Sequence, residues 1–214
     1  MSKVKSRPSN NFHCFEGRGL KFWEAIAKGM RPSGFSNSPD GYQMEMARDI
    51  DGAVVQNGGM FAPQHTKLTA GTYFRFYGSI TRNKYGDDNA VSGGWWIDLD
   101  TYATVCDWAE THDISIAKAA QQLLVIPNEW HDCGYVAKGL LLREMKAWVG
   151  KGKPATGTVS PDSAMRGRIP VSMSPAHLEI KQYFVPGDRA LLSRCFQRLS
   201  SLQVTSKGLG RPLV

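Results

Sequence analysis

The apolar positions in the middle of the chain recur at the spacing of helices. Two such stripes follow residues that can cap a helix, Asp100 or Thr101 before the first and Ser115 before the second. The stripes consist of Tyr102, Val105, Cys106 and Ala109, and of Ile116, Ala119, Ala120, Leu123 and Leu124. Pro127 ends the second stripe, because proline cannot donate the backbone hydrogen bond of a helix interior. This pattern predicts two consecutive amphipathic helices.

Three more helices are predicted on either side of this pair. A short amphipathic helix is expected over residues 20–29, where a glycine supplies the stop. Another is expected over residues 133–149, and a C-terminal helix rich in Leu and Arg begins at about residue 190. Residues 1–19 show no periodic pattern and are expected to be irregular.

Runs of β-branched and aromatic residues between turn residues predict four strands. They are the run TYFRFYG after Gly71 and residues 94–99, 168–173 and 178–185. The polar residues 79–93 between the first two strands are predicted to form a loop that is mobile or faces a ligand. Residues 151–163, rich in Gly, Pro and Ser, are predicted to form a second loop.

Strands thus precede a block of helices and strands follow it, an order that favours an α+β domain over a doubly wound sheet. The whole chain, residues 1–214, is predicted to form a single domain, with an irregular N-terminal segment at 1–19 and the core at 20–214. No Gly-x-Gly-x-x-Gly or Walker sequence is present, so a phosphate or nucleotide site must be built in another way.

Composition adds limits on compartment and chemistry. Four cysteines lie far apart without a C-x-x-C pair, so we expect reduced, mostly buried thiols and no disulfide framework. The basic N-terminus lacks the apolar region of a secretory signal, and no apolar run approaches the ~20 residues of a membrane helix. We therefore expect no membrane partner and a location in the cytoplasm, or delivery into a target cell without a signal peptide.

The first candidate for binding chemistry is the strand around Arg75. Side chains alternate across a strand, so Tyr73, Arg75 and Tyr77 share one face and the two phenylalanines share the other, which suits a core. An arginine between two tyrosines offers a bidentate phosphate donor beside rings on which a ligand can stack. The alternative is an ordinary arginine that faces solvent on a half-buried sheet.

The second candidate is the segment SGGWWID. Its paired glycines, including Gly94, let the backbone approach a ligand closely, and a tryptophan beside them can stack on a base or a nicotinamide ring. Trp95 and Trp96 point to opposite faces, so we expect at most one of them to stack. The alternative is that both tryptophans fill the core and the glycines form a turn.

The third candidate is the late strand HLEIKQYFVPG. In a regular strand Ile180, Gln182 and Phe184 share a face, whereas Glu179 lies with Lys181 on the other. Glu179 and Gln182 therefore cannot both enter one cleft without a bulge. The alternative is a solvated pair of Glu179 with Lys181, and a Gln182 that makes hydrogen bonds at a sheet edge.

Together YFRFYG, GGWWID and QYFVPG resemble the ADP-ribosyltransferase superfamily, including bacterial NAD glycohydrolase toxins. The resemblance implies a split antiparallel or mixed β core with an inserted helical block, Arg75 on an early strand, and Gln182 or Glu179 as the catalytic residue. It implies NAD as the substrate, and an immunity protein or a macromolecular ADP-ribose acceptor as further partners. The Ser-Thr-Ser element and the Glu-x-Glu or Gln-x-Glu pair are missing, which counts against transfer to a protein arginine.

Cleavage of the nicotinamide–ribose bond of NAD suits such a site chemically. Nicotinamide leaves from a cationic form, so the reaction needs a pyrophosphate clamp, a stacked ring and a hydrogen bond to the ribose rather than a strong acid. An amide at Gln182 accepts that hydrogen bond but is no strong base, which favours hydrolysis. A carboxylate at Glu179 would leave transfer to an acceptor open.

Other classes of function remain open at this point. The net charge is +7, and Lys and Arg outnumber Asp and Glu in residues 1–37 and 138–214 but not in residues 38–137. Basic ends and aromatic residues also fit a nucleic-acid-binding or nuclease-type toxin, and an interaction module is a third class. The five histidines are dispersed without the spacing of a metal site, so no metal is predicted.

Overall fold

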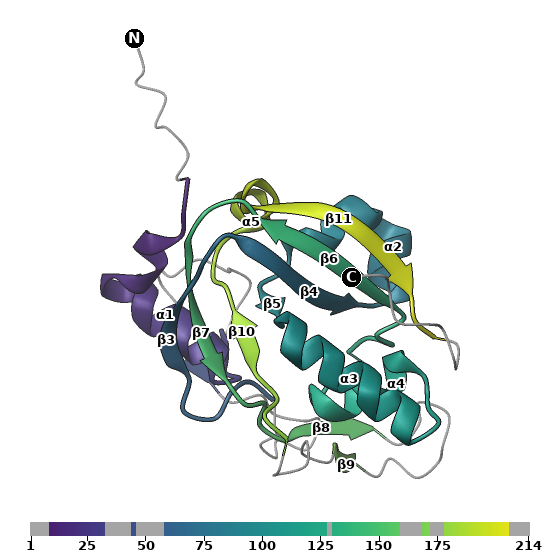
Figure 1. Cartoon of the computed structure of the whole chain (residues 1–214). Coiled ribbons are helices and arrows are strands. Elements are labelled where there is room, and N and C mark those ends of the chain that lie inside the picture. The colour runs from purple at the N-terminus through teal and green to yellow at the C-terminus, as the bar shows by residue number, and fades with distance from the viewer. Residues whose placement is uncertain are drawn as a thin grey trace.

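A computed structural model of the chain describes residues 9–32, 44–45, 58–127, 130–158, 168–171 and 178–205. Helices and antiparallel sheets together make an α+β fold, which confirms the predicted class (Figure 1).

Two open sheets form the centre of the described structure (Figure 1). The first has the order β3-β7-β10-β5 and the second has the order β11-β6-β4, with every neighbouring pair antiparallel. The strands of the first are β3 (Gln64–Leu68), β5 (Trp95–Trp96), β7 (Met145–Gly150) and β10 (Gln182–Phe184). Those of the second are β4 (Gly71–Tyr77), β6 (Tyr135–Leu141) and β11 (Phe196–Gln203).

The two sheets meet at a single isolated bridge between described residues. Phe74 on β4 and Ile97, just after β5, exchange backbone hydrogen bonds of 2.9 Å in both directions. Because Asp98 already caps the next helix by accepting from the Thr101 N–H, the chain leaves the sheet at once. Among the described residues, this bridge is therefore the one place where backbone hydrogen bonds pair the two sheets, and side chains such as Trp96 and Phe196 pack between them elsewhere.

Helices cover both sheets. The helices α3 (Leu99–Thr111) and α4 (Ile116–Leu123) pack on the phenylalanine face of β4, where Phe74 stacks on Tyr102 at a ring distance of 4.3 Å. The 3-10 helix η1 (Phe12–Phe15) and α1 (Gly17–Ala27) pack on the first sheet. The helices α2 (Ser79–Tyr85), η2 (Asp87–Ser92) and α5 (Arg189–Cys195) lie near the second sheet (Figure 1).

Two short strand pairs complete the described elements. They are β1 (Arg31–Pro32) with β2 (Met44–Glu45), and β8 (Ala155–Thr158) with β9 (Arg168–Val171). β8 lies within residues 151–163, which were predicted to form a loop. That prediction is wrong for the residues of β8. The predicted strand over 168–173 is confirmed as far as residue 171, and its last two residues lie outside the described part of the chain.

Several predictions from the periodicity are confirmed. The first strand, both helical stripes and the Ser115 cap are as expected, with the Ser115 hydroxyl accepting from the Lys118 N–H at 3.2 Å. The four cysteines are free and buried. Among the described residues, no helix combines the length and the apolar character needed to cross a bilayer.

The predicted helix over residues 133–149 is wrong, because these residues form β6 and β7 in different sheets. Each of the two strands has a neighbour on both sides, so the pairing satisfies backbone groups that a helix would have satisfied locally. Gly139 also favours the strand, since an added Cβ there would lie 2.9 Å from the Trp96 ring that packs on it. The apolar run over residues 133–149 fits the period of a helix as well as that of a strand. Pairing with distant strands therefore decides its structure.

Five further predictions need correction. The expected loop over 79–93 is largely helical, as α2 and η2. The expected C-terminal helix ends at Cys195 and continues as β11. The expected strands over 94–99 and 178–185 are shorter in the structure, as β5 and β10. The N-terminal cap of α3 is Asp98 and not Asp100 or Thr101.

The N-terminal segment is fastened to the sheet by the completely buried amide of Asn11. Its Nδ2 donates to the carbonyls of Lys146 at 2.7 Å and Pro186 at 3.0 Å, and its Oδ1 accepts from the Lys146 N–H at 2.9 Å. One side chain thus joins the start of η1 to β7 and to the chain after β10.

We expect Asn11→Ala to lower the free energy of unfolding by about 2 to 3 kcal/mol, because it leaves buried backbone groups without partners. Urea denaturation measures the effect. Asn83→Ala is the matched control, since Asn83 is exposed on α2 and should stay within about 0.5 kcal/mol of the parent. Equal stability of the two variants would contradict this role of Asn11.

Candidate functional site

A pocket of about 260 Å³ opens beside the bridge that joins the two sheets. Its walls come from β4, β5, β10, the turn after α4 and the segment before β6. Four polar side chains line it: Arg75, His131, Lys153 and Gln182. No acidic residue is found among the described residues that line it. The pocket thus combines apolar walls with donors and two basic groups, which suits an anionic ligand with a planar ring.

Arg75 enters the pocket from β4 without a carboxylate partner among the described residues. Its Nη1 donates to the Ala90 carbonyl at 2.7 Å, and its Nε is buried without a hydrogen-bond partner. Burial, and secondarily the charge of Arg189, lower the pKa of Arg75 to about 10, so it stays protonated at neutral pH. A cation with a free donor in a pocket is a candidate for binding an oxyanion.

Gly93 makes room for the Arg75 guanidinium. An added Cβ at Gly93 would lie 2.2 Å from the Arg75 Nη2, well inside van der Waals contact. The backbone at Gly93 is extended, with φ −91°, so the contact and not a special conformation requires glycine there. This position is next to Gly94, for which the sequence predicted close approach to a ligand.

Gln182 comes to the same pocket from β10, and only 8% of it is exposed. Its Nε2 donates to the Leu124 carbonyl at 3.1 Å, which leaves the Oε1 without a donor among the described residues. Ile180, Gln182 and Phe184 are all buried, so the predicted shared face is confirmed. The alternative of a sheet-edge position is wrong, because β10 lies between β7 and β5.

Glu179 lies outside the pocket. Its side chain is 86% exposed, and its carboxylate is 3.7 Å from the Lys181 ammonium, which is the solvated pair that the alternation allowed. Gln182 rather than Glu179 therefore lies with Arg75.

Of the predicted aromatic residues, both tryptophans line the pocket. Trp96 is 1% exposed, stacks on Phe196 at 4.0 Å and donates to the Gly93 carbonyl at 2.8 Å, so most of it belongs to the core. Trp95 is partly buried, with its ring 5.1 Å from that of Phe184. Of the two, Trp95 is the one with surface left for a ligand.

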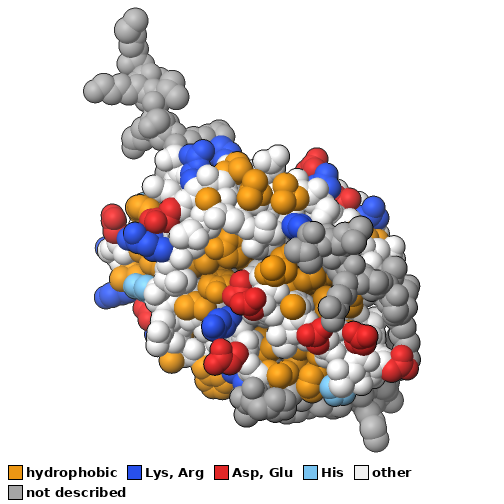
Figure 2. Space-filling view, in the orientation of Figure 1, with side chains coloured by type: hydrophobic (Ala, Val, Ile, Leu, Met, Phe, Trp, Pro, Cys, Tyr) orange, Lys and Arg blue, Asp and Glu red, His pale blue; other side chains and the backbone are white. Residues whose placement is uncertain are grey.

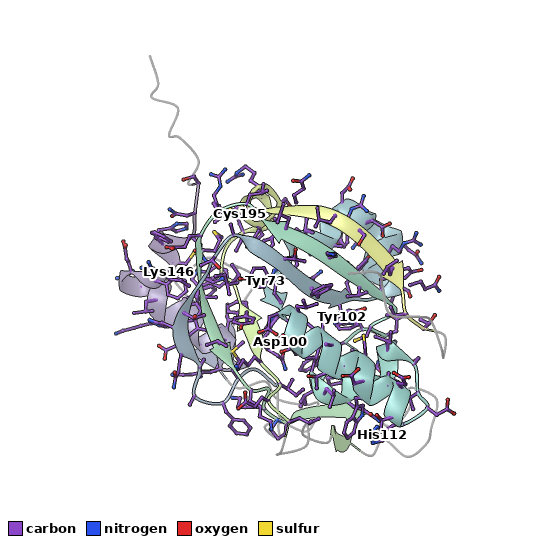
Figure 3. All side chains as sticks on the ribbon, viewed as in Figure 1. Tyr73, Asp100, Tyr102, His112, Lys146 and Cys195 are labelled. Carbon is purple, nitrogen blue, oxygen red and sulfur yellow. The ribbon has the colours of Figure 1, made fainter. Side chains whose placement is uncertain are left out.

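Tyr73, Tyr77 and Gly94 do not line this pocket. Figure 3 shows Tyr73 between β4 and β10, where its ring is 6.2 Å from that of Tyr183. Tyr77 is 1% exposed and donates to the Asp87 carboxylate at 2.9 Å. The tyrosine face of β4 is thus filled by neighbouring elements, which corrects the expectation of rings that flank Arg75 for stacking. Gly94 instead gives room to β10, since an added Cβ would lie 2.8 Å from the Val185 oxygen.

Trp130 and His131 are among the lining residues that the sequence analysis missed. The Trp130 ring is 41% exposed, lies over Gly58 and has no aromatic partner among the described residues, so it is free to stack. Both residues follow Pro127 in a segment without periodicity, where no pattern indicates which way a side chain points. The adjacent tryptophan and histidine were the only available signal.

His131 is held as an uncharged ring. Burial, and then the charge of Arg75, lower the pKa of His131 to about 4, against the opposite effect of Asp132. Burial would raise the pKa of Asp132, but hydrogen bonds from Ser79 and Gly134 lower it below its ordinary value. Asp132 thus directs its carboxylate to these neighbours.

Two residues beside the pocket have a left-handed backbone. Val125 in the wall has φ 56°, and Cys133, two residues after His131, has φ 52°. This conformation is rare for a β-branched residue and costs of order 1–3 kcal/mol, so the surrounding structure must enforce it. Strain of this kind clusters at binding sites.

Comparison with known protein families, curated proteins and solved structures gives no match for this chain.

The shifted pKa of His131 predicts a loss of stability in acid. Between its ordinary value of 6.5 and about 4, the unfolded chain binds a proton that the folded protein does not. Stability should therefore fall as the pH drops through this window, by up to about 3 kcal/mol. The stability that the Asp132 carboxylate contributes is lost only at lower pH, because its pKa lies below the ordinary value of 3.8.

Urea denaturation across this pH range, for the parent and for His131→Gln, checks this expectation. The variant should lose most of the pH dependence, because its side chain does not titrate. An unchanged slope in the variant would mean that His131 is not the group responsible.

Proposed function

We propose that the chain binds NAD in this pocket and cleaves the bond between nicotinamide and ribose. The observation that carries the proposal is the meeting of Arg75 and Gln182, from strands far apart in the sequence, in one pocket lined by tryptophans. The unpaired Nε of Arg75 offers a donor to the pyrophosphate, and the Oε1 of Gln182 offers an acceptor to a ribose hydroxyl.

The size of the pocket fits part of the dinucleotide. Its volume of about 260 Å³ is below the ~300–1,000 Å³ typical of pockets that enclose a whole ligand. Nicotinamide and its ribose would occupy it, with the adenosine half outside. Trp95 and the free ring of Trp130 are then the groups available for stacking on the nicotinamide.

Hydrolysis requires little proton transfer from the protein. The glycosidic C–N bond breaks with its electron pair moving to the positively charged nicotinamide, which leaves neutral, and water adds to the ribose carbon and loses a proton to solvent. The hydrogen bond from a ribose hydroxyl to Gln182 Oε1 would strengthen as positive charge develops on the sugar. Because the pocket lining described here holds no carboxylate, hydrolysis to ADP-ribose is favoured over transfer to an acceptor.

The architecture supports the same proposal. Two open antiparallel sheets whose backbones are paired at one bridge between described residues, with α3 and α4 between β5 and β6 in the chain, are compatible with an ADP-ribosyltransferase-like core. On the face that Figure 2 shows, Lys and Arg side chains are interspersed with acidic ones and form no continuous basic surface.

Gln182→Ala should lower kcat for NAD cleavage by at least ~100-fold with little change in KM, because the lost hydrogen bond acts mainly in the transition state. Release of free nicotinamide over time measures this. The matched control is Glu179→Ala on the same segment, whose exposed carboxylate should be dispensable. Full activity of both variants would contradict the catalytic role, and loss of activity only in Glu179→Ala would place that carboxylate at the ribose.

Gly93→Ala should lower kcat/KM by about 10- to 100-fold by displacing the Arg75 guanidinium, which an added Cβ would overlap. Gly71→Ala on β4 is the control, because its nearest contact is the Thr69 oxygen at 3.8 Å. Thermal unfolding should show both variants folded. A fully active Gly93→Ala would mean that the position of Arg75 does not matter for NAD cleavage.

A further inference from the structure

The imidazole of His131 has a fixed proton. Its Nδ1 lies 3.1 Å from the backbone nitrogen of Cys133, and a backbone N–H can only donate. Nδ1 is therefore the acceptor, and in the uncharged ring the proton is on Nε2. The left-handed conformation of Cys133 belongs to the turn that makes this contact.

The Nε2–H of His131 has no acceptor among the described residues. The neighbouring carboxylate of Asp132 does not compete for it, because its oxygens accept from the Ser79 N–H at 2.9 Å, the Ser79 hydroxyl at 2.6 Å and the Gly134 N–H at 3.1 Å. Since His131 lines the pocket, this donor is free to meet a ligand.

His131 lies on the Arg75 side of the pocket. Its Cβ packs on Gly78, where an added Cβ would be 2.6 Å away, and Gly78 follows β4 directly. The charge of Arg75 also contributes to the low pKa of His131, so the two groups lie within electrostatic range of each other. Arg75 and His131 thus line the same side of the cavity, and each has a donor, Nε–H and Nε2–H respectively, without a hydrogen-bond partner among the described residues.

We infer that His131 is a specificity-determining residue whose Nε2–H donates to an oxyanion of the ligand, together with the guanidinium of Arg75. A phosphate has enough acceptor oxygens for both donors, whereas a sugar hydroxyl or a neutral carboxamide would leave the guanidinium without a counter-charge. The site then selects nicotinamide nucleotides over nicotinamide nucleosides. The preference for nicotinamide nucleotides rests on the proposed function, but the oxyanion site does not.

The first test compares two substrates, NAD and nicotinamide riboside, which carries the same glycosidic bond without phosphate. His131→Ala should lower kcat/KM for NAD by about 10- to 100-fold, the effect of losing a hydrogen bond to a charged group, and change that for the riboside less than about threefold. His131→Gln, which keeps an N–H donor, should recover part of the loss. Equal losses with both substrates would overturn the inference.

His112→Ala is the matched control. His112 is exposed at the end of α3, stacks on Trp108 at 3.8 Å and lies at the edge of the molecule in Figure 3. Both substrates should be turned over by this variant as by the parent. A loss specific to NAD in His112→Ala would show that the effect does not belong to the pocket.

The second test needs no turnover. Binding of inorganic pyrophosphate, followed by the fluorescence of the tryptophans that line the pocket, should weaken at least about tenfold in His131→Ala and recover in part in His131→Gln. Undiminished pyrophosphate binding in a folded His131→Ala would overturn the inference. If the parent releases no nicotinamide from either substrate while pyrophosphate binding still depends on His131, the proposed function fails and the oxyanion site stands.

Discussion

The pair of backbone hydrogen bonds between Phe74 and Ile97 is the constraint on which the rest of the structure depends. Among the described residues it is the only pairing between the two sheets, because β5 is two residues long and Asp98 turns the chain into α3 immediately afterwards. Longer pairing would continue one sheet into the other and close the space between them. The pocket opens beside this short contact, and both Phe74 and Ile97 line it.

Glycines then determine where the polar side chains of the pocket can lie. Arg75 packs on Gly93, Gln182 on Gly152, and His131 on Gly78, with added Cβ distances of 2.2, 2.7 and 2.6 Å to the respective side chains. Backbone close to a polar side chain excludes water from it, which is why the Arg75 Nε is buried without a partner. Burying a donor without a hydrogen-bond partner costs free energy, and a ligand that supplies the acceptor offsets this cost.

Local patterns in the sequence predicted correctly which side chains are buried within a single strand or helix. Alternation in a strand gave the burial of Gln182 and the exposure of Glu179, and helical periodicity gave both stripes of α3 and α4. The same alternation placed Arg75 on the face of β4 opposite the two phenylalanines, but it could not tell that the tyrosines of that face are covered by neighbouring elements.

The failures have a common physical cause, which is that pairing between distant segments outweighs local preference. Residues 133–149 form two strands because neighbours far along the chain supply hydrogen bonds on both edges of each. Trp130 and His131 reach the pocket in a segment that packs on the distant Gly58 and Gly78 and is held by hydrogen bonds from Ser79 to Asp132. No pattern in their own segment carries that information.

A crystal structure of the protein with an NAD analogue that resists cleavage would show directly whether NAD binds in this pocket. We expect the nicotinamide ribose in the pocket between β4 and β10, with a ribose hydroxyl at Gln182 Oε1 and a phosphate oxygen at Arg75 Nε. An analogue bound at another surface, or one that leaves both Arg75 and Gln182 without contact, would contradict it.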